Sequence, residues 1–219
     1  MSYEFLIAGL PDLKQGSLLT MEALTELLEE QLSEKDKRLW KSLVSVSSPE
    51  DEDGNECQKP NTECKNVFLN DWFAFNHDLN NILTAAICRK HNIDMRKQIK
   101  AESGHSDDNN TWSVGTSVSE QILANPNAKD FGLKGTSPIV EEVLRIAAIE
   151  NLLEREQAID AIRQAWLEEH TLFNYFGIEK VLSYWLQSEI LHRWDNLTME
   201  TGQRVFRELV NDMKKSIKI

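Results

Sequence analysis

Cysteine and histidine side chains are the first candidates for chemistry in this sequence of 219 residues, because both can bind a metal ion. Cys57, Cys64, Cys88 and His91 supply three thiols and one imidazole, which is nominally the ligand set of a tetrahedral zinc site. Structural zinc sites space their paired cysteines more closely than Cys57 and Cys64 are spaced. We therefore interpret the cysteines as incidental reduced thiols of a cytosolic protein.

A second metal hypothesis concerns a helical di-iron enzyme. Glu189 and His192 are three residues apart on a predicted helix and match half of a di-iron carboxylate site. The complementary pair would be Glu102 and His105, but Gly104 interrupts any helix between them. A surface Glu–His pair is therefore the favoured interpretation of Glu189 and His192.

Other local signatures of catalysis are absent from the sequence. It contains no nucleophile elbow, dinucleotide-binding glycine motif, P-loop or His-Glu-x-x-His motif. The acidic segment 50–56 resembles a calcium loop, but Pro49 and Pro60 occupy the first and last ligand positions. We expect no metal, no cofactor and no catalytic residue, which favours a binding or assembly protein over an enzyme.

Four residues are candidates for a partner interface: Asn76, Asn80, Asn174 and Tyr175. Asn76 lies within the apolar stripe of a predicted helix, Asn80 lies at the edge of that stripe, and Asn81 lies on the opposite side. A buried Asn needs hydrogen-bond partners, and these are either groups of the same chain, which we favour, or groups of another protein.

The aromatic side chains of the C-terminal half form a dense run. They are Trp166, Phe173, Tyr175, Phe176, Tyr184, Trp185 and Trp194. We favour the interpretation that they fill the core of a helical bundle. The alternative is an anchor surface for a partner protein, because Trp and Tyr are enriched at binding hot spots.

Helical periodicity recurs along the chain, and no sustained alternating pattern of β-strands interrupts it. The expected helices begin at Met21 after Thr20, at Ser33, at Leu69 with Asn70 as cap, at Ser117 with Glu120, after Ser137-Pro138, at Glu154, at Phe173 and at Thr198. We predict an all-α fold, a multi-helix bundle of seven to nine helices with a disordered acidic insert at 48–66. It forms a single domain over 1–219, or two packed lobes over 1–125 and 126–219.

The composition restricts the classes of partner. With 36 acidic and 24 basic residues, the formal net charge is −12, which disfavours nucleic acids and anionic lipid. The start of the chain lacks the basic residues of a signal peptide, and no apolar run approaches the length of a membrane span. We therefore expect a cytoplasmic protein.

Four stretches of the sequence resemble a bacterial family of proteins of unknown function. They are Tyr3-Glu4-Phe5-Leu6-Ile7-Ala8-Gly9-Leu10-Pro11-Asp12-Leu13, the segment 72–92 with its Asn-Asn and Arg-Lys pairs, Asp130-Phe131-Gly132-Leu133, and the block 152–194. The genes of this family typically lie among those for V/A-type rotary ATPases. The family is similar, more distantly, to the C subunit of these ATPases, which is called d in the eukaryotic enzyme.

The resemblance implies an all-α, non-catalytic adapter that links the central stalk of a V/A-type ATPase to its membrane rotor ring. Its partners would be the stalk and ring subunits, and it would lie at the inner membrane only through that complex. Two alternatives remain: a cytosolic helical scaffold or regulator unrelated to the ATPase, and a helical metalloenzyme.

Overall fold

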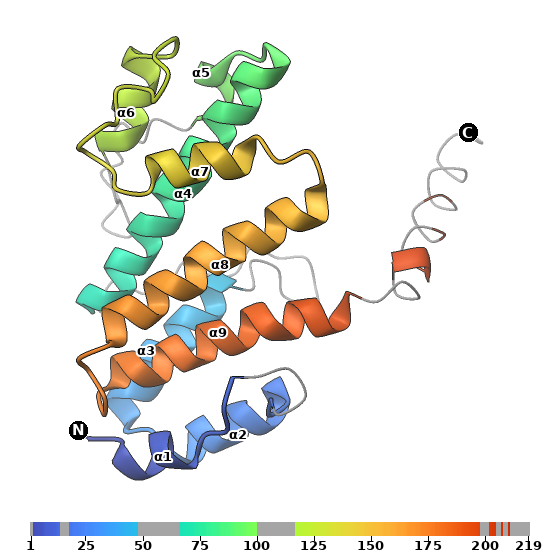
Figure 1. The fold of residues 1–219 in the computed structure, drawn as a ribbon. Helices are drawn as coiled ribbons and strands as arrows, with labels where there is room; N and C mark the ends of the chain where they lie inside the picture. Colours follow the sequence, from blue (N-terminus) through green and yellow to red (C-terminus); the bar gives the residue numbers. More distant parts are fainter. Residues whose placement is uncertain are drawn as a thin grey trace, which may run out of the picture. The chain divides into compact units, whose positions relative to one another are not determined.

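Helices make up the regular secondary structure of the protein in the computed structural model (Figure 1). The structure describes residues 2–13, 18–47, 66–99 and 117–197, together with 202–204, 207 and 210. Over these residues it contains no strand, which confirms the predicted all-α class. The helices are α1 (Glu4–Gly9), α2 (Met21–Gln31), α3 (Glu34–Ser47), α4 (Val67–His91), α5 (Met95–Gln98), α6 (Ser117–Ala124), α7 (Val140–Ala147), α8 (Leu152–Thr171) and α9 (Ile178–Asn196). Residues 48–65 of the acidic insert predicted at 48–66 lie outside the described residues.

The chain divides into two compact units whose boundaries differ from the expected division at residue 125. Unit 1 comprises Met1–Ser33 and Thr171–Ile219, and unit 2 comprises Glu34–His170. Unit 1 combines both ends of the chain because α2 packs against α9. Two hydrogen bonds reinforce this pairing: Tyr184 donates its hydroxyl to the carbonyl of Pro11, and Nε2 of His192 lies 2.7 Å from the carbonyl oxygen of Leu19.

Local capping signals predicted some helix starts correctly. Thr20 caps α2, because its side chain accepts a hydrogen bond from the N–H of Ala23. The expected cap Asn70 was wrong, since it lies inside α4 and donates its own N–H to the carbonyl of Asn66. Asn66 is the actual cap, and its side chain accepts from the N–H of Leu69.

The starts of α6 and α7 lie close to their predicted positions. Helix α6 begins at Ser117 and ends at Ala124, as the sequence predicted. Helix α7 begins at Val140, so Ser137-Pro138 is not its cap. These two residues belong to a preceding turn, in which the N–H of Ser137 bonds to the carbonyl of Leu133.

Helix α4 is the central element of unit 2, and it is buried on more than one face. Its buried residues are Phe68, Leu69, Trp72, Phe75, Leu79, Asn81, Ile82, Leu83, Ala85 and Cys88. Asn81 was predicted on the exposed side, which was wrong because α5, α6 and α7 all pack against α4. On the side of α8, Phe68, Trp72 and Phe75 place their rings 5.2–5.7 Å from that of Trp166.

Arg89 fastens the turn after α6 to the end of α4. Its guanidinium donates to the backbone carbonyls of Pro126, Ala128 and Lys129 at 2.7–3.2 Å. The same group lies 3.8 Å above the ring centre of Phe131, a fully buried residue in the left-handed backbone region. Such a conformation is strained for a bulky residue. The contacts of Arg89, which we call the Arg89 clamp, and the burial of the ring must therefore hold Phe131 in place.

The neighbouring Asp130 and Gly132 complete this turn. The carboxylate of Asp130 accepts the N–H of Gly132, which has a φ of 73°. A side chain at Gly132 would also meet Asn125 at 2.9 Å, so glycine is required here for two reasons. Arg89 of the Arg-Lys pair and Phe131 of the Asp130-Phe131-Gly132-Leu133 motif, both singled out in the sequence, are therefore in direct contact.

None of the helices in the described ranges is both long enough and apolar enough to cross a membrane.

We predict that Arg89→Met destabilises the protein by about 2–4 kcal/mol, because three backbone carbonyls lose their donor. Chemical denaturation monitored by circular dichroism measures this change. Lys90→Met is the matched control, since Lys90 is the exposed neighbour on the same helix and its loss should stay within about 0.5 kcal/mol. Equal stability of the two variants would contradict the clamp.

Candidate protein-interaction site

The loop between α8 and α9 displays large apolar side chains to solvent. Leu172, Phe173, Tyr175 and Phe176 are 54%, 88%, 59% and 48% exposed, and we call residues 172–176 the aromatic loop. Assignment of the whole aromatic run to the core was therefore wrong for Phe173, Tyr175 and Phe176. Of the other aromatic residues in that run, Trp185 is buried and Trp166, Tyr184 and Trp194 are half-buried.

Asn174 determines the shape of this loop. Its side-chain oxygen accepts the N–H of Gly177 at 3.0 Å, and its side-chain nitrogen donates to Glu179 at 2.7 Å. Gly177 is the N-cap of α9 and has an extended backbone, so the helix begins at Ile178 rather than at the predicted Phe173. The backbone thus leaves the helical path between Phe173 and Gly177.

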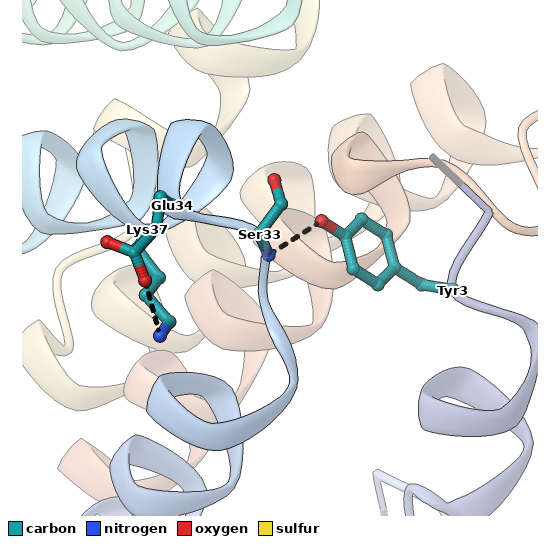
Figure 2. A network of polar contacts seen from close by, with 4 residues as sticks. All are labelled: Tyr3, Ser33, Glu34 and Lys37. Atoms are coloured by element: carbon teal, nitrogen blue, oxygen red, sulfur yellow. Dashed lines mark hydrogen bonds and ion pairs between the residues drawn. The ribbon is translucent and has the colours of Figure 1, made fainter.

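Tyr3 fixes the other end of the loop from within unit 1. Its backbone N–H donates to the carbonyl of Phe176 at 2.8 Å, and its hydroxyl accepts the N–H of Ser33 at 3.3 Å (Figure 2). The side chain of Tyr3 is itself buried. The loop is therefore hydrogen-bonded to the start of α9 and to Tyr3. Tyr3 directly precedes α1 and is itself bonded to Ser33, which follows α2.

The view in Figure 2 also includes an ion pair in α3 of unit 2. Lys37 lies 2.9 Å from the carboxylate of Glu34, and this contact lowers the pKa of Glu34. Both groups are near the surface and in the first turn of the helix, so we assign the pair a local role only.

Phe5 adds a further exposed ring to the same unit. It follows Tyr3 by two residues, lies in α1 and is 94% exposed. We define the aromatic surface as Phe5 together with Leu172, Phe173, Tyr175 and Phe176. Tyr3, two residues before Phe5, is bonded to Phe176, and large exposed apolar side chains on neighbouring segments are typical of contact sites for other molecules.

The described part of unit 1 is acidic. It contains nine acidic and four basic residues, the basic ones being Lys180, Arg193, Arg204 and Arg207. Four of the acidic residues, Glu22, Glu26, Glu29 and Glu30, lie exposed on α2, and Glu4 is exposed beside Phe5. This part of the protein therefore combines apolar contact area with a negative field.

Asn76 is bonded within its own chain, as we favoured from the sequence. Its side-chain nitrogen donates to the carbonyl of Trp72, and its oxygen accepts from Nε of Arg163 at 3.0 Å. Arg163 in turn pairs with the buried carboxylate of Asp160 at 3.0 Å. The oxygen of the Asn76 amide joins α4 to α8 and its nitrogen is bonded within α4, so both ends have partners in the same chain and Asn76 is not part of the interaction surface.

The four predicted interface residues do not form one site within either unit. Asn76 and Asn80 belong to unit 2, where Asn80 is exposed on α4. Asn174 and Tyr175 belong to unit 1, where Asn174 shapes the aromatic loop and Tyr175 is exposed on it. Tyr175 is thus the predicted residue that lies exposed on the aromatic loop.

The metal hypotheses gain no geometric support from the described residues. Nowhere in them do three or more His, Cys, Asp or Glu side chains converge in a way that could hold an ion. Cys88 is buried and its burial raises the pKa of its thiol, whereas His91 is exposed. His192 contacts the backbone at Leu19. The remaining candidates, Cys57, Cys64, Glu102, His105 and the segment 50–56, lie outside the described residues.

A surface cleft of about 440 Å³ lies between the end of α4, α5 and the turn after α6. Cys88, Arg89, Arg96, Leu123 and Pro126 are among its lining residues. The two terminal nitrogens of the Arg89 guanidinium are bonded to backbone carbonyls. Burial lowers the pKa of Arg89, and the carbonyl oxygens compensate its charge. We therefore interpret Arg89 as a structural residue of the turn.

Sequence reasoning missed the exposed Phe5 and Leu172, and it favoured the core for Phe173 and Phe176, for which the anchor surface was only the alternative. A signal was present in Asn174-x-x-Gly177, because Asn and Gly favour turns and interrupt helices. Starting the helix after Gly177 would have placed Phe173 and Phe176 on a loop.

We predict that Asn76→Leu lowers the free energy of unfolding by about 1–3 kcal/mol, because Arg163 loses an acceptor in a half-buried site. Thermal and chemical denaturation measure the change. Asn80→Leu is the control on the exposed side of the same helix and should be close to neutral. An Asn76→Leu protein as stable as the wild type would show that the bond to Arg163 contributes nothing.

We also predict that Asn174→Ala loosens the aromatic loop, because the N–H of Gly177 loses its acceptor. Hydrogen exchange at Gly177 should become faster, with a stability loss of about 1 kcal/mol. Tyr175→Ala, which removes an exposed side chain from the same loop, should leave that exchange rate unchanged. Unchanged exchange in Asn174→Ala would mean that other contacts hold the loop.

Comparison with known proteins gives one result that bears on identity. No curated protein and no solved structure is significantly similar to the chain. The family model described as "Protein of unknown function (DUF2764)" matches residues 58–217, which is most of the chain and includes the aromatic loop and α9. The chain therefore belongs to the DUF2764 family.

Proposed function

We propose that this protein is a non-catalytic adapter or accessory subunit of a V/A-type rotary ATPase that links the central stalk to the membrane rotor ring. The observation that carries the proposal is the aromatic surface of unit 1, in which Phe173 is 88% exposed on a hydrogen-bonded loop. Exposing such a side chain forgoes the burial energy of a large ring, about 1.5–3 kcal/mol, and this loss favours a role in binding.

The fixed shape of the aromatic loop supports a protein partner. Asn174, Gly177 and the backbone bond from Tyr3 hold the loop before any partner arrives. A preformed surface loses less conformational entropy on binding than a mobile one. Aromatic side chains on a rigid support are the usual hot spots of protein interfaces.

The sequence resemblance supports the choice of complex. The segments at 3–13, 72–92, 130–133 and 152–194 resemble proteins encoded beside V/A-type ATPase genes and, more distantly, the C subunit. An all-helical chain with an acidic surface is compatible with an adapter that receives other subunits. The exposed aromatic surface thus supports a binding role, and the sequence resemblance supports the V/A-type ATPase as the partner.

Co-purification tests this function. We expect that a tagged copy of the protein, extracted from its own membranes in mild detergent, retains central-stalk and rotor-ring subunits of the ATPase. Quantitative mass spectrometry measures their recovery against an untagged strain. An intact rotor complex that consistently lacks this chain would overturn the proposal, and recovery of unrelated soluble proteins alone would favour the scaffold alternative.

A further inference from the structure

We infer that the aromatic surface binds a basic, amphipathic α-helix of a partner protein. The inference rests on the proposed function as an interaction subunit and names the chemistry of what it binds. Phe5, Leu172, Phe173, Tyr175 and Phe176 supply the apolar contact area, with exposed fractions from 48% to 94%.

The negative charge of unit 1 favours a positively charged partner. Nine acidic residues against four basic ones among the described residues of unit 1 produce a negative field around it. A basic segment is attracted and oriented by this field, whereas a second copy of the same surface or an anionic bilayer is repelled. Electrostatic attraction of this kind mainly raises the association rate and decides between competing partners.

The backbone of the aromatic loop indicates whether the partner segment is extended or helical. Over the described residues there is no strand, so an extended peptide finds no strand edge to which it could add. In the loop, the N–H groups of Asn174 and Gly177 and the carbonyl of Phe176 already have partners. These bonded groups and the missing strand edge favour recognition through side chains, and an apolar stripe on a helix presents several side chains together.

The aromatic rings are suited to this task because they are not needed for folding. Phe5 and Phe173 are almost completely exposed, so replacing them removes little buried area. The groups that shape the site, Tyr3 and Asn174, are different residues. Binding and stability can therefore be separated by mutation.

The direct test uses the full-length protein and a labelled synthetic peptide of about 18 Leu and Lys residues, long enough to form a helix on contact. Its Leu residues follow the i, i+3, i+4, i+7 pattern. One control peptide has the same composition in scrambled order, and a second replaces every Lys by Glu. We expect the basic striped peptide to bind about tenfold more tightly than either control, and to weaken as salt is raised.

Paired variants locate the binding surface. Phe5→Ser combined with Phe173→Ser should weaken peptide binding about tenfold or more while the melting temperature is unchanged. Val67→Ser is the control, because Val67 is 72% exposed but belongs to unit 2. Equal binding by the double variant, or equal binding of the scrambled peptide, would overturn the inference.

Three further measurements identify a different occupant, and each positive result would also overturn the inference. Sedimentation velocity would reveal a dimer that the double variant abolishes, which identifies a second copy. Anionic phosphatidylserine vesicles would bind the wild type but not the double variant if the surface contacts lipid. If residues 198–219 cover the surface, a protein shortened to end at Leu197 would bind the peptide and the full-length protein would not.

Co-purification of the double variant separates this inference from the proposed function. If the ATPase subunits accompany the wild type but not the double variant, both proposals stand. If they accompany both proteins equally, the adapter function stands and the assigned surface is wrong. If the striped peptide binds as expected but no ATPase subunit is recovered with the wild type, the surface stands and the adapter function is wrong.

Discussion

Helix α4 needs cover on more than one face, and the arrangement of unit 2 follows from this requirement. Its buried apolar side chains each stabilise the fold by about 1.5–3 kcal/mol if neighbouring elements exclude water from them. A single partner helix covers only one stripe, so α5, α6, α7 and the Trp166 side of α8 all contribute. Arg89 then serves a second requirement, because the turn that follows α6 has carbonyl groups that must be satisfied beside α4.

In unit 1, hydrogen bonds hold a loop whose large apolar side chains are exposed. Tyr3 and Asn174 use their hydrogen-bonding groups to hold a loop whose large side chains remain in water. At this loop the polar groups of Asn174 and the backbone are bonded within the chain while the large apolar side chains lie in water, although the rest of unit 1 buries an apolar core. Such an arrangement is informative because it costs stability in the isolated chain and gains free energy only when another molecule covers the rings.

The sequence predicted those features that depend on neighbouring residues. Thr20, the end of α6 and the all-α class could be predicted because capping and periodicity act over a few positions. The prediction of Asn70 as the cap of α4 failed because Asn66, one turn earlier, is an equally good capping residue, and its side chain accepts the N–H of Leu69. The burial of Asn81 could not be predicted, since it depends on helices that follow much later in the chain.

The candidate site was predicted only in part, for the same reason. Tyr175 was identified because tyrosine is a common interface residue, and the internal bonding of Asn76 followed from the cost of a buried amide. The exposure of Phe173 and Phe176 depends on where α9 begins. That start is set by Asn174 and Gly177, and a backbone contact with Tyr3 supports the loop from the far end of the sequence.

The discontinuous construction of unit 1 has a consequence for the order of events during synthesis. The contacts Tyr3–Phe176, Pro11–Tyr184 and Leu19–His192 each join residues 173 positions apart. Unit 2 is continuous in the chain, so its contacts can form while the ribosome is still adding α9. The N-terminal segment must wait for that last helix, and only a chain synthesised at least as far as α9 can present the completed surface.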